Sequence, residues 1–328
     1  MSSGYVLESV VAPYIAGLVA EKRALGFKYA DAERELARFD RYCAERSLRD
    51  PAFTREFLED WCRRRPTEGQ SYRDKRVSVV RQLVKYMASV GVCAYLPQLR
   101  SSRSVTLPHI LTDEERMAFF ESVDSYEPVA GTPANLRLAG EWKVLFRMIY
   151  SCGLRNSEAC GIASDKVDLE GGVLEIADSK GRKSRLVYMP DDLRALCSDY
   201  FAWLSRALDG APPWFFPARD PGKPLVNTTV CRAFNRFWAR TRFSAACSNK
   251  PTTHDLRFSF VTDRVNAWAL EGVDLGAMVP YLSRYLGHRD IEETYYYFHT
   301  SKQLHDVIAM YDSTSGTAIP EVTPYEIG

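Results

Sequence analysis

The chain has 328 residues, of which 46% are apolar and 26% charged, and its net charge is +1. This length favours two domains, and the apolar share is sufficient for two folded cores. No apolar run reaches the roughly 18 residues of a membrane span, and the first residues show no signal-peptide pattern. Composition therefore argues against a membrane protein, a secreted protein and a disordered chain, and we expect a cytoplasmic location.

The eight cysteines are scattered, with no CxxC pair and no histidine at zinc-ligand spacing. They predict buried thiols in a reducing compartment, without a disulfide framework or a metal site.

Positive charge is unevenly distributed along the chain. Residues 61–104 hold ten Lys or Arg against two acidic residues, and residues 223–264 hold eight against two. One such stretch is typical of a solvated helix face, whereas two in one chain favour a polyanionic partner such as DNA.

The first region shows apolar residues at helical spacing in four segments and no strand pattern. The predicted helices cover residues 5–25, 31–47, 53–65 and 70–91. The last of them carries five basic residues within a few turns, so several can face one partner: Arg73, Lys75, Arg76, Arg81 and Lys85.

A polar segment with Pro108, residues 99–110, is interpreted as the interdomain linker. It leads to four predicted parts, namely a helical DNA-binding domain at 1–100, a linker at 101–110, a catalytic domain at 111–312 and a tail at 313–328.

The second region begins with "LTDEERMAFFESVD", where Thr112 and Glu115 have the spacing of a capping box. Residues 171–190 predict a β-hairpin with a basic tip, "SKGRK". Helical patterns follow at 191–208, 226–242, 254–270 and 275–287, then in a short segment carrying three tyrosines and at 301–311. The fold class is mainly α with a small antiparallel β-sheet.

Four features of this region point to phosphate chemistry when they are taken together. In "GLRNSE", Arg155 opens a helix whose N–H groups can help to bind an anion, although a surface pair with Glu158 would explain it equally. In "HDLR", His254 and Arg257 share one helical face, or form a chance pair at a capped helix start. In "LGHRDIEETYYYFH", Tyr297 lies nine residues after His288.

The fourth feature is Lys180 at the predicted hairpin tip, in "DSKGRKSR". A lysine on a turn is usually only solvated, and the other three features give it significance.

In this order and spacing, "GLRNSE", "SKGRKSRLVYMP", "HDLR" and "LGHRDIEETYYYFH" resemble the boxes of the tyrosine recombinase family, also called phage integrases. The resemblance covers residues 110–300. The first region matches the family's SAM-like core-binding domain in size and character only. Phe258 stands where the family often has a second histidine, and the span between "HDLR" and "LGH" is long. This longer form is more similar to recombinases of mobile elements.

The resemblance implies that Tyr297 attacks a DNA phosphodiester, giving a 3′-phosphotyrosine and a free 5′-hydroxyl. Arg155 and Arg257 would clamp the non-bridging oxygens, where charge grows in the transition state. Lys180 would protonate the leaving 5′-oxygen, with Lys183 as its rival for this role. No metal and no cofactor is expected.

The two histidines have expected roles as well. His254 would accept the tyrosine proton or hold the phosphate, and His288 would donate a hydrogen bond to it. Arg182 and Arg185 are expected to contact DNA phosphates, and Glu158 to orient Arg155.

The three adjacent tyrosines cannot all face one phosphate, because successive helical residues point about 100° apart. Spacing from His288 selects Tyr297, with Tyr296 as the alternative nucleophile. Tyr295 and Tyr296 are then packing residues.

The expected partner is double-stranded DNA, on which the protein would form a homo-oligomer, dimer to tetramer, alone or with sister recombinases. The first region and the catalytic region would clamp the duplex, with the basic helix at 70–91 in the major groove. Residues 301–312 would dock on a neighbouring subunit or cap their own. Two alternatives stay open, a type IB topoisomerase and a catalytically silent DNA-binding accessory subunit.

Overall fold

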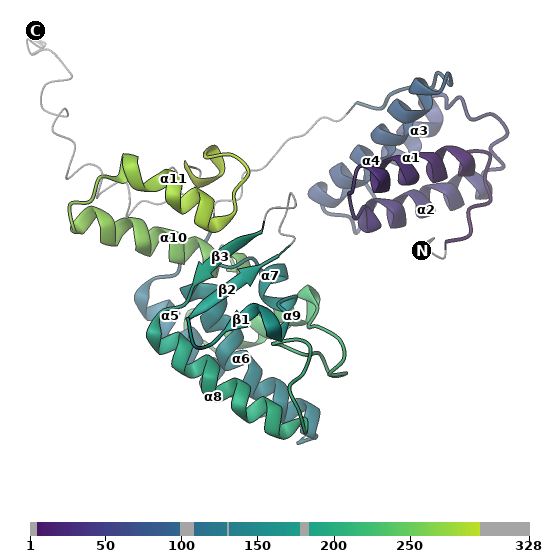
Figure 1. Ribbon diagram of the computed structural model, residues 1–328. Coiled ribbons are helices and arrows are strands. Elements are labelled where there is room, and N and C mark those ends of the chain that lie inside the picture. Colours follow the sequence, from purple (N-terminus) through teal and green to yellow (C-terminus); the bar gives the residue numbers. More distant parts are fainter. Residues whose placement is uncertain (1–4, 99–107, 130, 178–183, 296–328) are drawn as a thin grey trace, which may run out of the picture. The chain divides into compact units, whose positions relative to one another are not determined.

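The structure, a computed structural model, describes residues 5–98, 108–129, 131–177 and 184–295 (Figure 1). The chain divides into two compact units between Val105 and Thr106, a position inside the predicted linker. The assignment of the first unit as a DNA-binding domain and of the second as the catalytic domain remains a prediction.

The described part of the first unit consists of four helices, as the apolar spacing predicts. These are α1 (Ala12–Ala24), α2 (Ala30–Glu45), α3 (Arg55–Cys62) and α4 (Gln70–Ser89). Helix α1 begins later than expected, because Pro13 occupies its first turn, where a proline is tolerated without loss of a hydrogen bond. Thr54 caps α3 by accepting a hydrogen bond from the backbone N–H of Phe57.

Aromatic and aliphatic side chains from these helices form the core of the first unit. Phe39 of α2 and Trp61 of α3 are buried edge to face, with ring centroids 5.1 Å apart. Val80, Leu83 and Met87 extend along the buried side of α4. This stripe follows the helical period, so the polar residues between its members lie on the opposite face.

The predicted DNA contact of Arg76 is corrected, because this residue belongs to the buried stripe of α4. Its side chain is fully buried and ion-paired with Glu68, with Nε and Nη2 at 2.8 and 2.9 Å from the two carboxylate oxygens. Further hydrogen bonds go to the carbonyls of Trp61 and Arg63. The guanidinium therefore joins α4 to the α3–α4 connection, and it has no exposed surface for DNA.

Replacing Arg76 by Met should lower the free energy of unfolding of the first unit by about 3–5 kcal/mol, because Glu68 would remain as a buried charge without its partner. Denaturant unfolding measures this change. Lys75→Met, at the adjacent exposed position, is the control, with an expected change within about 0.5 kcal/mol. Equal losses in the two variants would contradict the structural role of Arg76.

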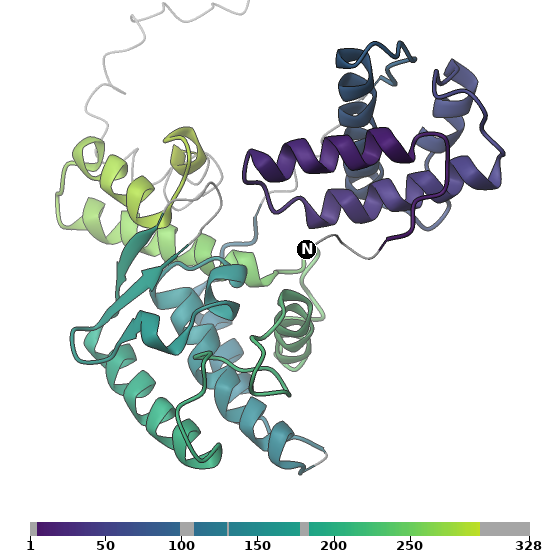
Figure 2. The ribbon, with the colours of Figure 1, turned by 45° about the vertical axis from the view of Figure 1, so that its right-hand side comes forward.

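The second unit packs helices around a small sheet (Figure 2). Its described elements are α5 (Asp113–Asp124), α6 (Pro133–Ser151), α7 (Asn156–Cys160), the 3₁₀ helix η1 (Ser164–Lys166), β1 (Val167–Asp168), β2 (Val173–Ile176), β3 (Arg185–Tyr188), α8 (Asp191–Ala207), α9 (Asn227–Trp238), α10 (Thr253–Leu270) and α11 (Leu275–Leu286). The mainly helical fold class with a small antiparallel sheet is confirmed.

The sheet has the order β1-β2-β3 with antiparallel neighbours, and Leu174 pairs with Val187 in its centre. Strands β2 and β3 correspond to the predicted hairpin, whose tip lies outside the described residues. Strand β1 was not predicted, because two residues are too few to show an alternating pattern.

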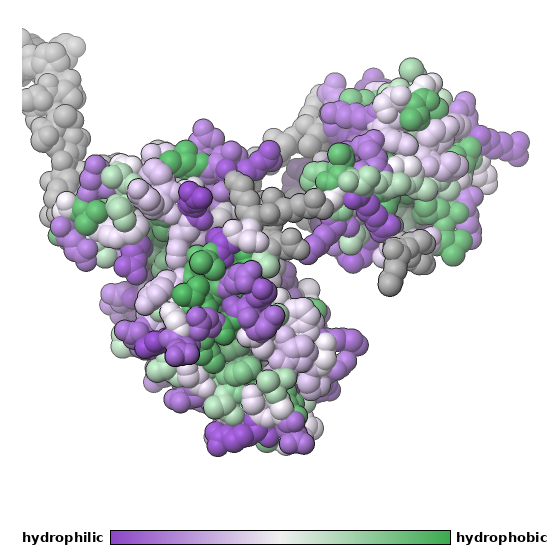
Figure 3. Space-filling model, viewed as in Figure 1, coloured by the Kyte–Doolittle hydropathy of each residue, from purple (hydrophilic) through white to green (hydrophobic). Residues whose placement is uncertain are grey.

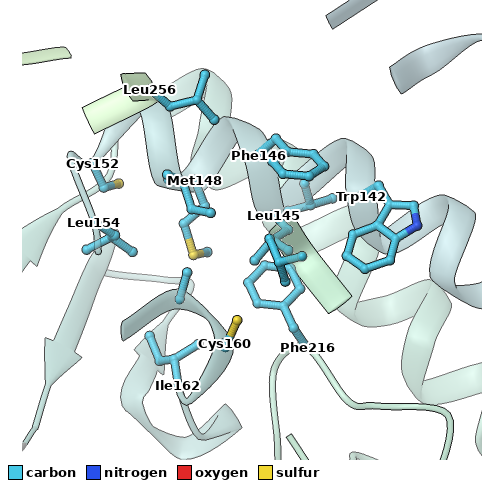
Figure 4. Close-up of a cluster of buried hydrophobic side chains, with 14 of the residues drawn as sticks. Trp142, Leu145, Phe146, Met148, Cys152, Leu154, Cys160, Ile162, Phe216 and Leu256 are labelled. Carbon is cyan, nitrogen blue, oxygen red and sulfur yellow. The ribbon is translucent and has the colours of Figure 1, made fainter. Parts of the chain in front are cut away.

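Helix α6 forms the centre of the second unit (Figure 4). Trp142, Leu145, Phe146 and Met148 point to several sides of the helix, and all are buried. They belong to a core that also contains Leu154, Cys160, Ile162, Phe216 and Leu256. Because α6 is held on several sides, the turn that follows it has a fixed position.

The start of the second unit is attached to α10. The capping box of α5 is confirmed, since Thr112 and Glu115 exchange hydrogen bonds at 3.0 and 3.2 Å. Just before it, the backbone N–H of His109 donates to Asp255 Oδ1 at 3.1 Å, and that of Leu111 donates to Ser259 Oγ at 3.0 Å. The end of the linker is therefore bonded to the helix that carries "HDLR".

All eight cysteines are free thiols, but the prediction that all are buried is wrong for three of them. Cys93 and Cys231 are exposed, and Cys247 is only partly buried. Cys231 lies on the polar side of the amphipathic helix α9. A small apolar residue is expected on the buried side of such a helix, so its exposure was not predicted.

The surface of the two units is largely hydrophilic in the view of Figure 3, with an apolar patch over the sheet region. Leu186 of β3 is 68% exposed. Across the described ranges, no helix combines the length and apolar character that crossing a membrane requires.

Candidate active site

Arg155 follows a tight turn that only glycine permits. Gly153 has a φ of 58°, and a Cβ at this position would lie 2.5 Å from the ring of Phe260. Arg155 comes two residues later, where its backbone N–H and its Nη1 each donate to Glu158 at 2.9 Å. Glu158 thus orients Arg155 as the i,i+3 spacing predicts, and a fixed arginine opens α7.

Arg257 reaches the same place from α10. Its side chain is buried, and Nη1 donates to the carbonyl of Gly153 at 2.7 Å. The same Nη1 lies 3.9 Å from Glu158 Oε2. The arginines of "GLR" and "HDLR", which are about a hundred residues apart in sequence, therefore share one carboxylate.

The C-terminal end of α11 completes this cluster. Its last carbonyls have no partner within the helix, and its dipole favours positive charge there. Three successive carbonyls each accept a hydrogen bond from a different arginine: Tyr285 from Arg185 Nε at 2.6 Å, Leu286 from Arg257 Nη2 at 2.8 Å and Gly287 from Arg155 Nη2 at 3.0 Å. Gly287 has a φ of 66°, so "LGH" is a left-handed helix end.

His288 follows this helix end and contacts Arg257. Its Nε2 lies 2.9 Å from Arg257 Nη2, and its Nδ1 lies 2.7 Å from the hydroxyl of Thr294. Since a guanidinium only donates, Nε2 must accept, and the ring proton is on Nδ1 and is donated to Thr294. In this structure the N–H of His288 is directed at Thr294, and the hydrogen bond from His288 to a phosphate stays a prediction.

The protonation state of His288 follows from its surroundings. Burial and the positive charges of Arg257, Arg155 and Arg185 lower the pKa of His288 to about 3. The ring is therefore neutral near pH 7, as its acceptor role toward Arg257 requires. Sequence reasoning missed Thr294, whose only sequence signal was its position in the "EETYYY" box.

His254 stands at the exposed N-terminal turn of α10. Its ring meets Phe258 edge to face, with centroids 5.1 Å apart. Desolvation of the ring and the charges of Arg257 and Arg155 lower the pKa of His254, against the opposing effect of Asp255. A neutral imidazole beside two guanidinium groups can accept a proton. Phe258, where the family often has a histidine, supports this ring.

The predicted phosphate contact of Arg185 is corrected as well. Its side chain is only 8% exposed, and its two terminal nitrogens donate to the two oxygens of Glu158 at 2.9 and 2.8 Å. Burial by itself would raise the pKa of Glu158, but the hydrogen bonds and charges of Arg185 and Arg155 outweigh it and lower that pKa to about 2. Arg185 is therefore directed at a permanently ionised carboxylate.

Several predicted residues lie outside the described residues, and their roles stay predictions: Lys180, Arg182, Lys183, Tyr296 and Tyr297. The segment just before Tyr296 is described, and residues 292–295 are helical. Tyr295 is 41% exposed.

Two of the predicted DNA contacts on α4 are partly engaged within the protein. Arg73 donates to the carbonyl of Cys62 at 2.9 Å, and Arg81 donates to that of Pro97. Lys75 is exposed. Sequence reasoning did not single out the exposed arginines of α9, Arg232 and Arg236, or the exposed Arg240 just after this helix.

The cluster has the chemistry of an oxyanion site. Arg155 and Arg257 are permanently charged planar donors, and such groups stabilise charge that develops on phosphate oxygens. A groove of about 850 Å³ adjoins the cluster between β3 and α11, with Arg185, Gly287 and His288 in its lining. Among the residues that the structure describes, no three or more His, Cys, Asp or Glu side chains form a group that could hold a metal ion.

A known protein family matches the part of the chain that contains this cluster. Residues 127–304, more than half of the chain, match the phage integrase family. The chain belongs to this family, the tyrosine recombinases, as its sequence motifs predict.

Relatives share sequence over most of their length. A putative integrase/recombinase, y4rB, of Sinorhizobium fredii is 28% identical over 86% of this chain and 90% of its own. A tyrosine recombinase, XerD, of Pseudomonas putida is 26% identical over 83% of this chain and 87% of its own.

Solved structures show the same fold at low sequence identity. A lambda integrase dimer bound to a core site has a TM-score of 0.58 with 14% identity, over 96% of this chain and 99% of its own. The Tn1549 transposon integrase bound to a circular-intermediate DNA has a TM-score of 0.58 with 15% identity, over 90% of this chain and 99% of its own.

His288 should stay neutral, with its proton on Nδ1, from about pH 5 to 8, the range in which an ordinary histidine titrates. Long-range ¹H–¹⁵N spectra of ring-labelled protein measure both properties, and the other four histidines serve as internal references. Titration of His288 within this range would contradict the assignment.

The same pKa shift predicts how stability depends on pH. Below the ordinary pKa of 6.5, the unfolded chain binds a proton at His288 that the folded chain does not bind. The contribution of His288 to stability is therefore fully present above about pH 6.5, and it decreases as the pH falls toward 3.

Proposed function

We propose that the protein is a site-specific DNA recombinase that cuts and rejoins DNA through a 3′-phosphotyrosine formed on Tyr297. The class of activity is that of the family to which the chain belongs. One observation supports the use of this site more than any other: Arg155 and Arg257 meet at Glu158 and at the end of α11. The chain leads from there through a helical segment to the tyrosines.

In the proposed reaction, the Tyr297 oxygen attacks the scissile phosphorus, and the bond from phosphorus to the 5′-oxygen breaks. The tyrosine proton passes to His254, which is neutral near pH 7 because its pKa is lowered. The leaving 5′-oxygen receives a proton from Lys180. Arg155 and Arg257 stabilise the charge on the non-bridging oxygens.

Rejoining is the reverse reaction with a 5′-hydroxyl of another DNA end. The phosphotyrosine is itself a phosphodiester, so the energy of the broken bond is retained and no ATP is required. His288 takes part indirectly in this proposal, since its Nε2 accepts from Arg257 and holds that guanidinium. No metal and no cofactor is included.

Exposed polar and basic faces in both units support DNA as the substrate. On α4, the exposed residues Ser71, Lys75, Gln82 and Lys85 form a stripe at helical spacing. Arg232 and Arg236 are exposed on the polar side of the amphipathic helix α9, and Arg240 is exposed just after its end. These residues, in place of Arg76 and Arg185, are the proposed phosphate and base contacts.

The proposal includes an assembly on DNA, a homo-oligomer of two to four subunits, alone or with sister recombinases. Lambda integrase has been crystallised as a dimer on a core site and as a tetramer on a Holliday junction. Such an enzyme would work in the cytoplasm, at the nucleoid. A transposon integrase among the structures of the same fold supports a role in a mobile element.

Tyr297→Phe should abolish the covalent protein–DNA adduct, because the phenolic oxygen is the nucleophile. The probes are nicked duplexes that tile the DNA on both sides of the gene, since a nick near the cut site lets the cleaved end escape and traps the adduct. Denaturing gels detect the adduct as a shifted protein band.

Tyr295→Phe and Tyr296→Phe are the matched controls, and both should retain the adduct. Loss of the adduct in Tyr296→Phe alone would transfer the nucleophile to Tyr296. Specific binding of a duplex by the wild-type chain without any adduct would favour a silent DNA-binding subunit.

A further inference from the structure

We propose that Arg185 is a positioning residue of the active site: it holds Glu158 and the end of α11 together, and through them it sets Arg155, Arg257 and His288. This inference rests on the proposed function for its catalytic consequence. The structural part of it concerns the free protein.

Three hydrogen bonds within the protein hold the side chain of Arg185. Two parallel hydrogen bonds to one carboxylate fix both the position and the plane of a guanidinium. Its third nitrogen donates to the carbonyl of Tyr285 at 2.6 Å. Every nitrogen of the side chain therefore has an acceptor within the protein, on residues 27 and 100 positions away.

Glu158, the partner of Arg185, also contacts the two other arginines of the cluster. The same carboxylate accepts from the backbone N–H and from Nη1 of Arg155, and lies 3.9 Å from Nη1 of Arg257. If Arg185 were absent, only the two guanidinium groups that face the substrate would compensate the charge of this carboxylate. Arg185 compensates its charge and leaves them available to a phosphate.

Arg185 packs closely against the "LGH" turn. A Cβ at Gly287 would lie 2.9 Å from Arg185 Nη1 and 3.2 Å from its Cζ. Glycine is therefore needed at this position for space as well as for its φ of 66°. The arginine packs against the backbone that carries the acceptor of Arg155 and leads directly into His288.

The test compares Arg185→Lys with Arg137→Lys. A lysine keeps the charge but cannot form the bidentate pair. Arg137 is a matched control: it is a buried arginine of the same unit, paired with buried Glu141, and its other hydrogen bonds go to the carbonyls of residues 217–219. Circular dichroism and melting curves establish that both variants are folded at the temperature used.

The first measurement needs no DNA. In ¹H–¹⁵N spectra of free protein, Arg185→Lys should shift the ring nitrogens of His288 or change its tautomer, because the end of α11 and Arg257 would move. Arg137→Lys should leave these signals in place. Unchanged His288 signals in Arg185→Lys would overturn the inference, whether or not the protein cleaves DNA.

The second measurement is the rate of adduct formation on the nicked duplex that the wild-type chain cleaves. Arg185→Lys should slow it roughly 10- to 100-fold, the scale of a small misplacement of reacting groups. DNA affinity should stay within about threefold of the wild type, because Arg185 does not touch DNA in this proposal.

A double-mutant cycle distinguishes positioning from direct phosphate contact. If Arg185 acts through Glu158, adding Arg185→Lys to Glu158→Gln should cause little further loss of rate. Multiplicative losses would overturn the inference and return Arg185 to the DNA surface. If the wild-type chain forms no adduct on any duplex, the proposed function fails, and the spectra of His288 still decide the positioning role.

Discussion

The active site depends on one constraint: the end of α11 and the carboxylate of Glu158 together must accept three arginine side chains. Tyr285, Leu286 and Gly287 offer successive carbonyls, and each binds a different guanidinium. One carboxylate beside three permanent cations leaves an excess of positive charge in a largely buried place. Such charge is costly to desolvate, and the helix-end carbonyls offset part of that cost. The remaining positive charge is what a phosphate would neutralise.

The two glycines of the site have a related function. Gly153 and Gly287 both adopt left-handed backbone, and each places a carbonyl on a guanidinium. A side chain at either position would collide with its neighbours, Phe260 in one case and Arg185 in the other. The turns of "GLR" and "LGH" are thus part of the arginine cluster as much as the charged residues are.

The sequence grouped Arg155, Arg257 and His288 through the order of their motifs, which resemble the boxes of the tyrosine recombinase family, and the structure places the three side chains together. The sequence was not sufficient for Arg185. A basic residue beside a hairpin tip is usually solvated, and its acceptor on Tyr285 is 100 residues away. Thr294 was missed for a similar reason, since its partner is set by the fold of the turn after His288.

Helix α4 shows the same limit in the first unit. Apolar spacing predicted its bounds within two residues of Gln70–Ser89. The spacing did not indicate that Arg76 belongs to the buried side, because a long amphipathic side chain fits either face. Its burial depends on Glu68 in the preceding connection. Counting basic residues in a helix therefore overestimates the charge that it presents to a partner.

The sequence distances within the arginine cluster have a consequence for how the enzyme is made. The hydrogen bonds that set the three guanidinium groups join residues 132, 100 and 104 positions apart. Contacts of such range form late, after most of the chain has been ordered. During synthesis, the carbonyls that orient Arg155 and Arg185 do not exist until the ribosome has passed residue 287. A nascent or prematurely terminated chain can carry Arg155, Glu158 and Arg185 and still lack a formed phosphate site, so the chemistry is withheld until the catalytic unit is complete.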